Sequence, residues 1–445
     1  MYDTVSQYGQ VLTNEVDDWH PPIMVRLWQL LHPFCAGSAP MFAIQVGLYA
    51  LGIGLIVGAL GRAGRTKAAF ATFILGASPL LLGWQMVVLK DAQMLGALLA
   101  ALGLAAHYRL QNVKIPFAAG AAMALLMAYA TLVRTNAIFV AAPLAAFLLP
   151  RPKRVPARSL LAIVLILVVL EITPTINQRV LGAESSDIAK SEPIFDLAAI
   201  AVAAPAASSP FTIAERARIE RLHCVKAFFW DPLGDPGACA PVAQRLMTQP
   251  ASALYLELAR AVAAHPIAYL EHRLEHWNST ERWLVAPGLP DQTPPIKAEP
   301  NELGLGTPSS ELASRWQDVA AVEAASPLGW PITWTAISLI LLPAAWRRRA
   351  ESAGGLALAL LASGLVLEAS FLAISIASDL RYHLWPMVAA PLALILLGDN
   401  LKLSRAERLA GTALVILVIA GGVISRASLP RAPDSYQGMI HAPTG

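Results

Sequence analysis

Long apolar segments alternate with short polar connections along most of this chain. A helix needs about 20 mainly apolar residues to cross the hydrocarbon core of a bilayer. Ten segments approach this length, and we predict a transmembrane helix in each: 40–60, 68–88, 91–107, 116–133, 136–150, 158–174, 330–346, 353–377, 382–398 and 409–425. The prolines inside them fit this prediction because membrane helices tolerate proline. The pattern therefore predicts an all-α, polytopic membrane protein.

The composition points to the same class of protein. Of the 445 residues, 56% are hydrophobic and 14% are charged, whereas about a quarter of the residues of a soluble domain are charged. The formal net charge of +3 is too small to indicate a nucleic-acid partner. The first 22 residues are polar and do not have the pattern of a signal peptide.

The Lys and Arg residues of the short connections fall mainly on one side of the predicted membrane. The opposite connections hold Lys90, Arg134 and Arg381. Basic residues accumulate in cytoplasmic loops, so the richer side is predicted to be cytoplasmic and these three cations to face outward. High alanine content and short loops favour a bacterial inner (plasma) membrane, with a site on the periplasmic or extracellular face. The richer side holds fifteen basic residues: Arg62, Arg65, Lys67, Arg109, Lys114, Arg151, Lys153, Arg154, Arg158, Arg347, Arg348, Arg349, Lys402, Arg405 and Arg408.

The spans predict three parts of the chain. Residues 1–174 form an N-terminal membrane module with about six spans, residues 175–329 an extracytoplasmic soluble region, and residues 330–445 a C-terminal membrane module with about four spans. On this orientation residues 1–22 lie outside with no span ahead of them. We therefore expect a further span to precede Tyr2 in a longer protein, with translocation of a short polar N-terminus as the alternative.

The soluble region predicts helices over Ser191–Ala204 and Glu215–Trp230 and a Pro- and Gly-rich loop over residues 286–310. Cys224 and Cys239 flank a turn-rich stretch, and outside the cytoplasm such a pair can form a disulfide. Residues 265–283 are amphipathic. His272 and His276 share one helical face there, a spacing that zinc ligands use, but a membrane-surface helix is the simpler interpretation.

The segment Asp17-Asp18-Trp19-His20-Pro21-Pro22 concentrates two carboxylates, an imidazole and a double proline. With Asp3 about fifteen residues upstream of Asp18, it resembles the first extracytoplasmic loop of protein O-mannosyltransferases and related GT-C glycosyltransferases. That family places its large extracytoplasmic insertion after the seventh helix, and here the insertion follows the sixth visible span. Other parts of the chain are similar to the polar residues that bacterial members carry between their spans: Trp84 with Lys90-Asp91, Arg134-x-Asn136, and Asp379-x-Arg381-Tyr382 with Trp385-Pro386.

This resemblance implies a GT-C-type helical bundle that transfers a sugar, hexose or pentose, from a polyprenyl-phosphate donor to a hydroxyl of a protein, lipid or glycan. Asp3 matches the family's acidic position and is implied as the general base that takes the acceptor proton. Protein O-mannosyltransferases carry an acidic pair there, whereas Thr4 follows Asp3, so Asp18 stays a second candidate base. The cations of the outer turns are expected to bind the lipid phosphate. The expected substrate-binding residues are Asp17, His20, Lys90, Asp91, Arg134, Asn136, Arg381, Tyr382 and His383.

Simpler interpretations stay open for individual residues. The outer cations can be anchors that reach the interface, His20 can cap the turn at Pro21-Pro22, and Tyr382 and His383 can belong to an interfacial aromatic belt. Glu368 lies inside a predicted span, where a carboxylate needs a partner, and Arg134 is the partner we expect.

Two other functions compete with glycosyl transfer. A transporter or flippase of lipid-linked sugars predicts internal repeats and charges near the bilayer midplane, and the sequence has no evident repeat. An O-antigen-type polymerase or ligase would use arginines of the large outer loop, where Arg216, Arg218 and Arg221 lie. No metal, cofactor or nucleic acid is expected.

Overall fold

The computed structural model describes residues 2–149, 154–204, 209–234, 237–306, 310–398, 401–433 and 435–441. Two residues of the predicted cytoplasmic connections, Arg151 and Lys153, lie outside these ranges. Within them the regular structure is helical, and the β-type pairings are isolated bridges, Asp17 with Glu184 and Phe229 with Ala377.

Within the described ranges, five helices are long and apolar enough to cross a membrane, or six if the bent pair α4 (Thr66–Gly76) and α5 (Pro79–Gln85) counts as one span. The chain is thus a helical membrane protein. The five are α3 (Ala39–Arg62), α9 with its π-helical end (Val155–Val180), α17 (Ser352–Ile374), η5 with α18 (Leu380–Leu397) and α19 (Arg405–Ser428).

The other expected spans are also helical, but they do not meet this standard of length and apolarity. Helices α7 (Phe117–Val133) and α16 (Pro331–Arg347) have 17 residues each. Helix α8 (Ile138–Leu148) follows a break at the 3₁₀ turn Thr135–Ala137. Helix α6 (Lys90–Arg109) has 20 residues with polar ends, and most of it is buried by protein. A helix covered by its neighbours does not need the apolar surface that lipid requires.

The chain forms two compact units. Unit 1 contains residues 1–185, 293–368 and 381–418, and unit 2 contains residues 186–292, 369–380 and 419–445. This division differs from the three expected parts. Residues 293–329, with α15 (Glu311–Ala325), belong to unit 1, and the ends of α17 and α19 belong to unit 2.

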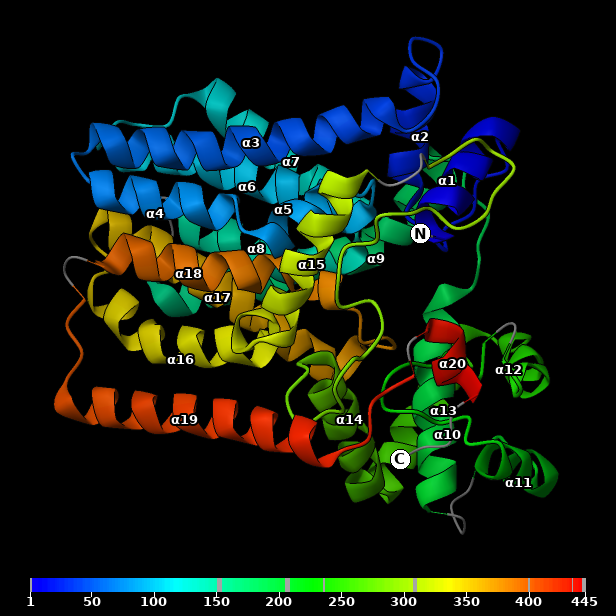
Figure 1. The fold of residues 1–445 in the computed structure, drawn as a ribbon. Coiled ribbons are helices and arrows are strands. Elements are labelled where there is room, and N and C mark those ends of the chain that lie inside the picture. Colours follow the sequence, from blue (N-terminus) through cyan, green and yellow to red (C-terminus); the bar gives the residue numbers. More distant parts are fainter. Residues whose placement is uncertain are drawn as a thin grey trace. The chain divides into compact units, whose positions relative to one another are not determined.

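Helices α3, α6 and α7 lie side by side in unit 1 (Figure 1). Glycine permits the close approach of α3 and α6. A Cβ at Gly52 would lie 2.5 Å from the carbonyl carbon of Leu99, and one at Gly103 would lie 2.8 Å from the carbonyl oxygen of Gly52. Small residues at such interfaces let membrane helices pack closely. Helix α6 is therefore held firmly against α3, which fixes the position of its N-terminal residues.

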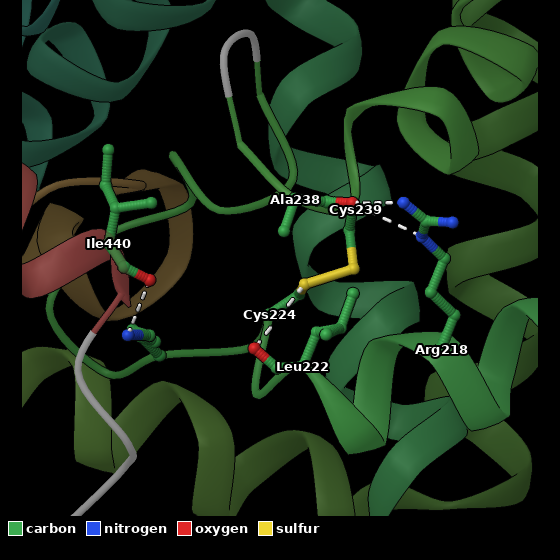
Figure 2. The surroundings of a disulfide bond; sticks show 7 residues. Arg218, Leu222, Cys224, Ala238, Cys239 and Ile440 are labelled. Atoms are coloured by element: carbon green, nitrogen blue, oxygen red, sulfur yellow. Dashed lines mark hydrogen bonds between the residues drawn. A yellow bond between two sulfur atoms is a disulfide. The ribbon is translucent and has the colours of Figure 1, made fainter.

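Unit 2 is built from α10 (Ser191–Ala203), α11 (Ile213–Arg221), α12 (Ala240–Met247), α13 (Ala251–Ala264), α14 (Pro266–Thr280) and α20 (Tyr436–His441). Its core contains Phe195, Trp230 and Leu254. Cys224 and Cys239 form a disulfide within that core, and Arg218 donates two hydrogen bonds to the Ala238 carbonyl beside it (Figure 2).

The helix expected over Ser191–Ala204 is confirmed as α10, whereas the one expected over Glu215–Trp230 is wrong in its second half. Helix α11 begins in a capping box at Thr212 and ends at Arg221. His223 has φ of 49°, a left-handed conformation that stops a helix, and the next residue is the bridged Cys224. The disulfide and the turn thus override the local helical pattern.

The disulfide should contribute measurably to the stability of unit 2. It closes a loop with a sequence separation of 15, for which chain entropy predicts about 3 kcal/mol. Replacing both Cys224 and Cys239 with alanine should therefore lower the free energy of local unfolding of residues 213–247, measured by hydrogen exchange, by about this amount. The exposed thiol Cys35 gives the matched control, since Cys35→Ser should leave exchange unchanged. Equal protection in all three proteins would contradict this prediction.

Candidate functional site

Charged side chains from four parts of unit 1 meet in one cluster. Asp3 comes from α1 (Tyr2–Thr13), Lys90 and Asp91 from the first turn of α6, Arg134 from the residue after α7, and Arg381 from η5 (Leu380–His383). We call these five residues the charged cluster. Each member lies at the end of a helix or in a short connection, which is where the sequence places the outer polar groups.

Local hydrogen bonds hold this part of the chain in place. The amide of Gln45 on α3 donates to the carbonyls of Gln85 and Val87, at 2.7 and 2.8 Å, and its oxygen accepts from the backbone N–H of Leu89. The hydroxyl of Thr4 donates to the carbonyl of Val88 at 2.6 Å. The start of α6 is therefore anchored to α3, and α1 is anchored to the start of α6, so Asp3 is held beside Lys90.

Two carboxylates alternate with three cations in the charged cluster. Asp3 lies 3.5 Å from the Lys90 ammonium and 3.2 Å from the Arg381 guanidinium. Asp91 lies 2.9 Å from Arg134 and 3.5 Å from Arg381. Arg381 thus bridges both carboxylates.

The aromatic ring of Tyr382 completes this arrangement. The guanidinium of Arg134 lies 4.0 Å from the ring centroid and that of Arg381 lies 5.7 Å from it, distances at which the ring attracts a cation. The ring therefore helps to hold the two arginines near each other. With three cations against two carboxylates, the charged cluster carries one excess positive charge, which favours an anion as its ligand.

Asp3 is a carboxylate throughout the physiological pH range. Burial by itself raises the pKa of Asp3, but the nearby Arg381 and Lys90, with a smaller effect of Arg134, outweigh burial and hold the pKa well below its usual range. An efficient general base has a pKa near the working pH. Asp3 is therefore a weak base as long as it stays paired with these cations.

His20 lies beside the charged cluster as a neutral hydrogen-bond donor. Burial and the neighbouring Lys90 lower the pKa of His20 to about 3. Its Nδ1 lies 2.9 Å from the Lys90 ammonium, and because an ammonium only donates, Nδ1 accepts and Nε2 carries the proton. This buried Nε2–H has no hydrogen-bond partner among the described residues. It is available to an oxygen of a ligand.

The depressed pKa of His20 predicts a pH dependence of stability. The folded chain resists protonation of His20 down to about pH 3, whereas the unfolded chain binds that proton near 6.5. The stabilising contribution is therefore complete above 6.5 and is lost as the pH falls through that window. Glutamine does not titrate. The free energy of unfolding of the wild type, relative to that of His20→Gln, should therefore fall by up to about 1.4 kcal/mol for each unit by which the pH is lowered.

Chemical unfolding of both proteins between about pH 4.5 and 6.5 measures this difference. The lower limit stays above the usual pKa of Asp3, 3.8, below which protonation of Asp3 in the unfolded chain would add a second pH dependence. Other groups that titrate in this window are common to both proteins and cancel. A difference that does not change with pH would show that His20 is protonated normally.

Four other expected site residues are not among the five residues of the charged cluster. Asp17 accepts from the backbone N–H of Trp19 in its own turn, and Asp18 accepts from Gln178 at the end of α9. Asn136 lies half-buried in the turn after Arg134. His383 is bound to Glu368, at 2.8 Å.

The expected pairing of Glu368 with Arg134 is therefore wrong. Arg134 lies against Asp91, and Glu368 on α17 is matched by His383 at the start of α18. Both members of this second pair are buried. The pairing satisfies a carboxylate inside a span with the nearest polar group of the next helix, which agrees with a structural role.

Two features near Asp3 were not anticipated from the sequence. Gln7 lies one helical turn after Asp3, is fully buried, and its amide has no hydrogen-bond partner among the described residues. In the sequence, the spacing of four residues between Asp3 and Gln7 could have indicated that both lie on the same face of a helix. A groove of about 400 Å³ is lined by Thr4 and Val5, by residues 86–88 and by residues of the loop at 295–306, including Lys297.

The paired histidines of α14 have protein partners. His272 lies 3.1 Å from Asp196, and His276 Nδ1 lies 2.7 Å from the carbonyl oxygen of Ala227. In the part of the chain that the structure describes, no group of three or more His, Cys, Asp or Glu side chains has the arrangement of a metal site. These histidines therefore belong to the interior of unit 2.

No family model, curated protein or solved structure matches this chain.

Proposed function

We propose that this protein is a glycosyltransferase of the GT-C type that moves a sugar from a polyprenyl-phosphate donor to an acceptor hydroxyl at the extracytoplasmic face of the membrane. One observation carries the proposal. Lys90, Arg134 and Arg381 come from three separate parts of the chain and meet around Asp3 and Asp91 with one positive charge in excess. A single lipid phosphate would neutralise this charge and accept hydrogen bonds from Lys90, Arg381 and His20.

The reaction follows from these groups. The acceptor oxygen forms a bond to the anomeric carbon while the bond from that carbon to the phosphate oxygen breaks, and the electron pair leaves with the lipid phosphate. The acceptor proton passes to a carboxylate oxygen of Asp3. Negative charge grows on the leaving phosphate, where Lys90 and Arg381 stabilise it in a site that excludes most water. The His20 Nε2–H adds a donor that needs no change of protonation.

Donor binding also makes Asp3 a better base. Without a phosphate, Lys90 and Arg381 hold the pKa of Asp3 below the useful range. A phosphate competes for the same two cations and cancels part of their field, which moves the pKa of Asp3 upward. The carboxylate thus becomes able to accept a proton only when the donor is present. Asp18, beside Gln178, stays the second candidate base.

Two further observations support an outer site. Disulfides form and persist in oxidising compartments, and the buried pair Cys224–Cys239 lies in the region that the charge distribution assigns to the outside. The connections rich in Lys and Arg, which positive-inside bias assigns to the cytoplasm, alternate along the chain with those that hold Lys90, Arg134 and Arg381.

Mass spectrometry of the lipid that co-purifies with the protein tests this function. The expected ligand is a polyprenyl phosphate or its sugar conjugate, and incubation of the conjugate with a mixture of hydroxyl acceptors should release free polyprenyl phosphate. Net movement of an intact sugar lipid across vesicle membranes without its cleavage would instead show a transporter. A co-purified lipid without a phosphate would contradict the proposed donor.

A further inference from the structure

Helix α14 has two chemically distinct faces. Ile267, Leu270 and Leu274 are 70%, 54% and 45% exposed, and their spacing of three and four residues places them on one side of the helix. The opposite side carries His272 and His276, which are buried. Three large apolar side chains in a row on an exposed face are an expected interaction surface. We call these three residues the α14 stripe.

The buried face of α14 is fixed to the end of a membrane span. Arg273 donates to the carbonyls of Phe371, Leu372 and Ser375, at 2.8–2.9 Å. The first two belong to the last turn of α17, whose carbonyls have no partners within the helix itself. Arg273 also lies 3.2 Å from Asp196 on α10. Helix α14 is therefore attached to the last turn of α17.

The segment after α14 is held by a second span. Arg426, near the end of α19, donates to the carbonyls of Arg282 and Trp283, at 2.7 and 3.0 Å. A Cβ at Gly421 of α19 would lie 3.1 Å from the Trp283 indole nitrogen and 3.2 Å from Leu284. The chain that follows α14 is thus packed on the side of α19.

Exposed apolar side chains lie both on α19 and on the segment after α14. Val423 and Ile424 of α19 are 52% and 65% exposed, and Leu284 is 45% exposed. Only 17% of the apolar window of α19 is buried by protein, which is the surface expected of a helix that faces lipid. The α14 stripe therefore belongs to an element whose two attachments both lie at the ends of spans, next to lipid-facing surface.

We propose that α14 lies in the membrane interface, with Ile267, Leu270 and Leu274 inserted at the boundary between headgroups and acyl chains. Amphipathic interfacial helices bury their apolar face about 5–10 Å into this boundary. The exposed acids Glu271 and Glu275 lie on the edge next to the stripe and stay in water. This inference concerns lipid alone and does not depend on the proposed transfer reaction.

Depth-dependent quenching tests this placement in the full-length chain. In a Cys35→Ser background, Leu270→Cys is labelled with a small fluorophore, and the protein is reconstituted into phosphatidylcholine vesicles with brominated acyl chains. Ile213→Cys on α11 is the matched control, since Ile213 is an exposed apolar residue, 79% accessible, on another helix of the same unit. The native disulfide keeps Cys224 and Cys239 unlabelled.

The label at position 270 is expected to be quenched at least twofold more than the label at 213, and a label at position 274 should behave like that at 270. Positions 213, 270 and 274 are all exposed, so the labelled proteins should retain their fold. A closed disulfide and unchanged helical content would verify this. Equal, weak quenching at 270, 274 and 213 in lipid alone would overturn the proposal and assign the stripe to a protein partner.

Discussion

Asp3→Asn is expected to slow sugar transfer by orders of magnitude while strengthening the binding of polyprenyl phosphate. An asparagine amide cannot take the proton from the acceptor hydroxyl. The rate of transfer should therefore fall by about 10²–10⁴-fold, the usual contribution of a general base. In the native site the Asp3 carboxylate occupies Lys90 and Arg381, at 3.5 and 3.2 Å. Its removal frees both cations for phosphate, and a gain of about fivefold in affinity would correspond to roughly 1 kcal/mol. Transfer assays and lipid titrations in nanodiscs measure the two effects.

Glu15→Gln is the control for charge alone. It removes one negative charge from the exposed connection between α1 and α2 (Pro22–Leu31), about twelve residues from Asp3 in the sequence. It should change neither transfer nor lipid affinity appreciably. If Asp3→Asn retained full transfer, the base would lie elsewhere, and Asp18→Asn would be the next variant to assay. Weaker lipid binding in Asp3→Asn would contradict the competition between Asp3 and phosphate.

Asp91→Asn should cause the largest loss of stability in unit 1. The Asp91 carboxylate is fully buried and lies 2.9 Å from Arg134 and 3.5 Å from Arg381. Its neutralisation leaves Arg134 and Arg381 close together with less compensation, and breaking a buried pair in this way costs about 3–5 kcal/mol. The expected result is a lower free energy of unfolding in detergent, together with a lower midpoint of thermal unfolding.

An exposed pair of the same type is the matched control. Glu311 and Arg315 lie 2.6 Å apart on α15, with side chains that are 81% and 75% exposed. Water and salt screen such pairs, so Glu311→Gln should have little effect on stability. Equal effects of Asp91→Asn and Glu311→Gln would show that the charged cluster is as well hydrated as the protein surface, which would weaken its role as an anion site.

The grouping of Lys90, Arg134 and Arg381 could be anticipated from the sequence, but their contacts could not. Loop charge bias placed Lys90, Arg134 and Arg381 on one side of the membrane, and the structure brings all three together with Asp3. Which carboxylate each cation binds depends on how the helices pack. Arg134 was expected beside Glu368, yet it lies against Asp91, because the start of α6 is anchored by Gln45.

Helical segments were easier to predict than their ends. Apolar runs indicated helices throughout unit 1 because hydrophobic length is a local property. The early end of α11 depends on the pairing of Cys224 with a residue 15 positions away and on the turn at His223. Likewise, the polar ends of α6 are tolerated because neighbouring helices cover it. Such tertiary effects leave little trace in a local pattern.

The most direct test of the account is an experimental structure of the full chain in lipid nanodiscs with polyprenyl phosphate. The account predicts the phosphate in contact with the Lys90 ammonium and the Arg381 guanidinium, with the Asp3 carboxylate moved away from at least one of them. Location of the phosphate among the basic connections at the opposite ends of the spans, with the Asp3–Lys90 and Asp3–Arg381 pairs unchanged, would contradict it.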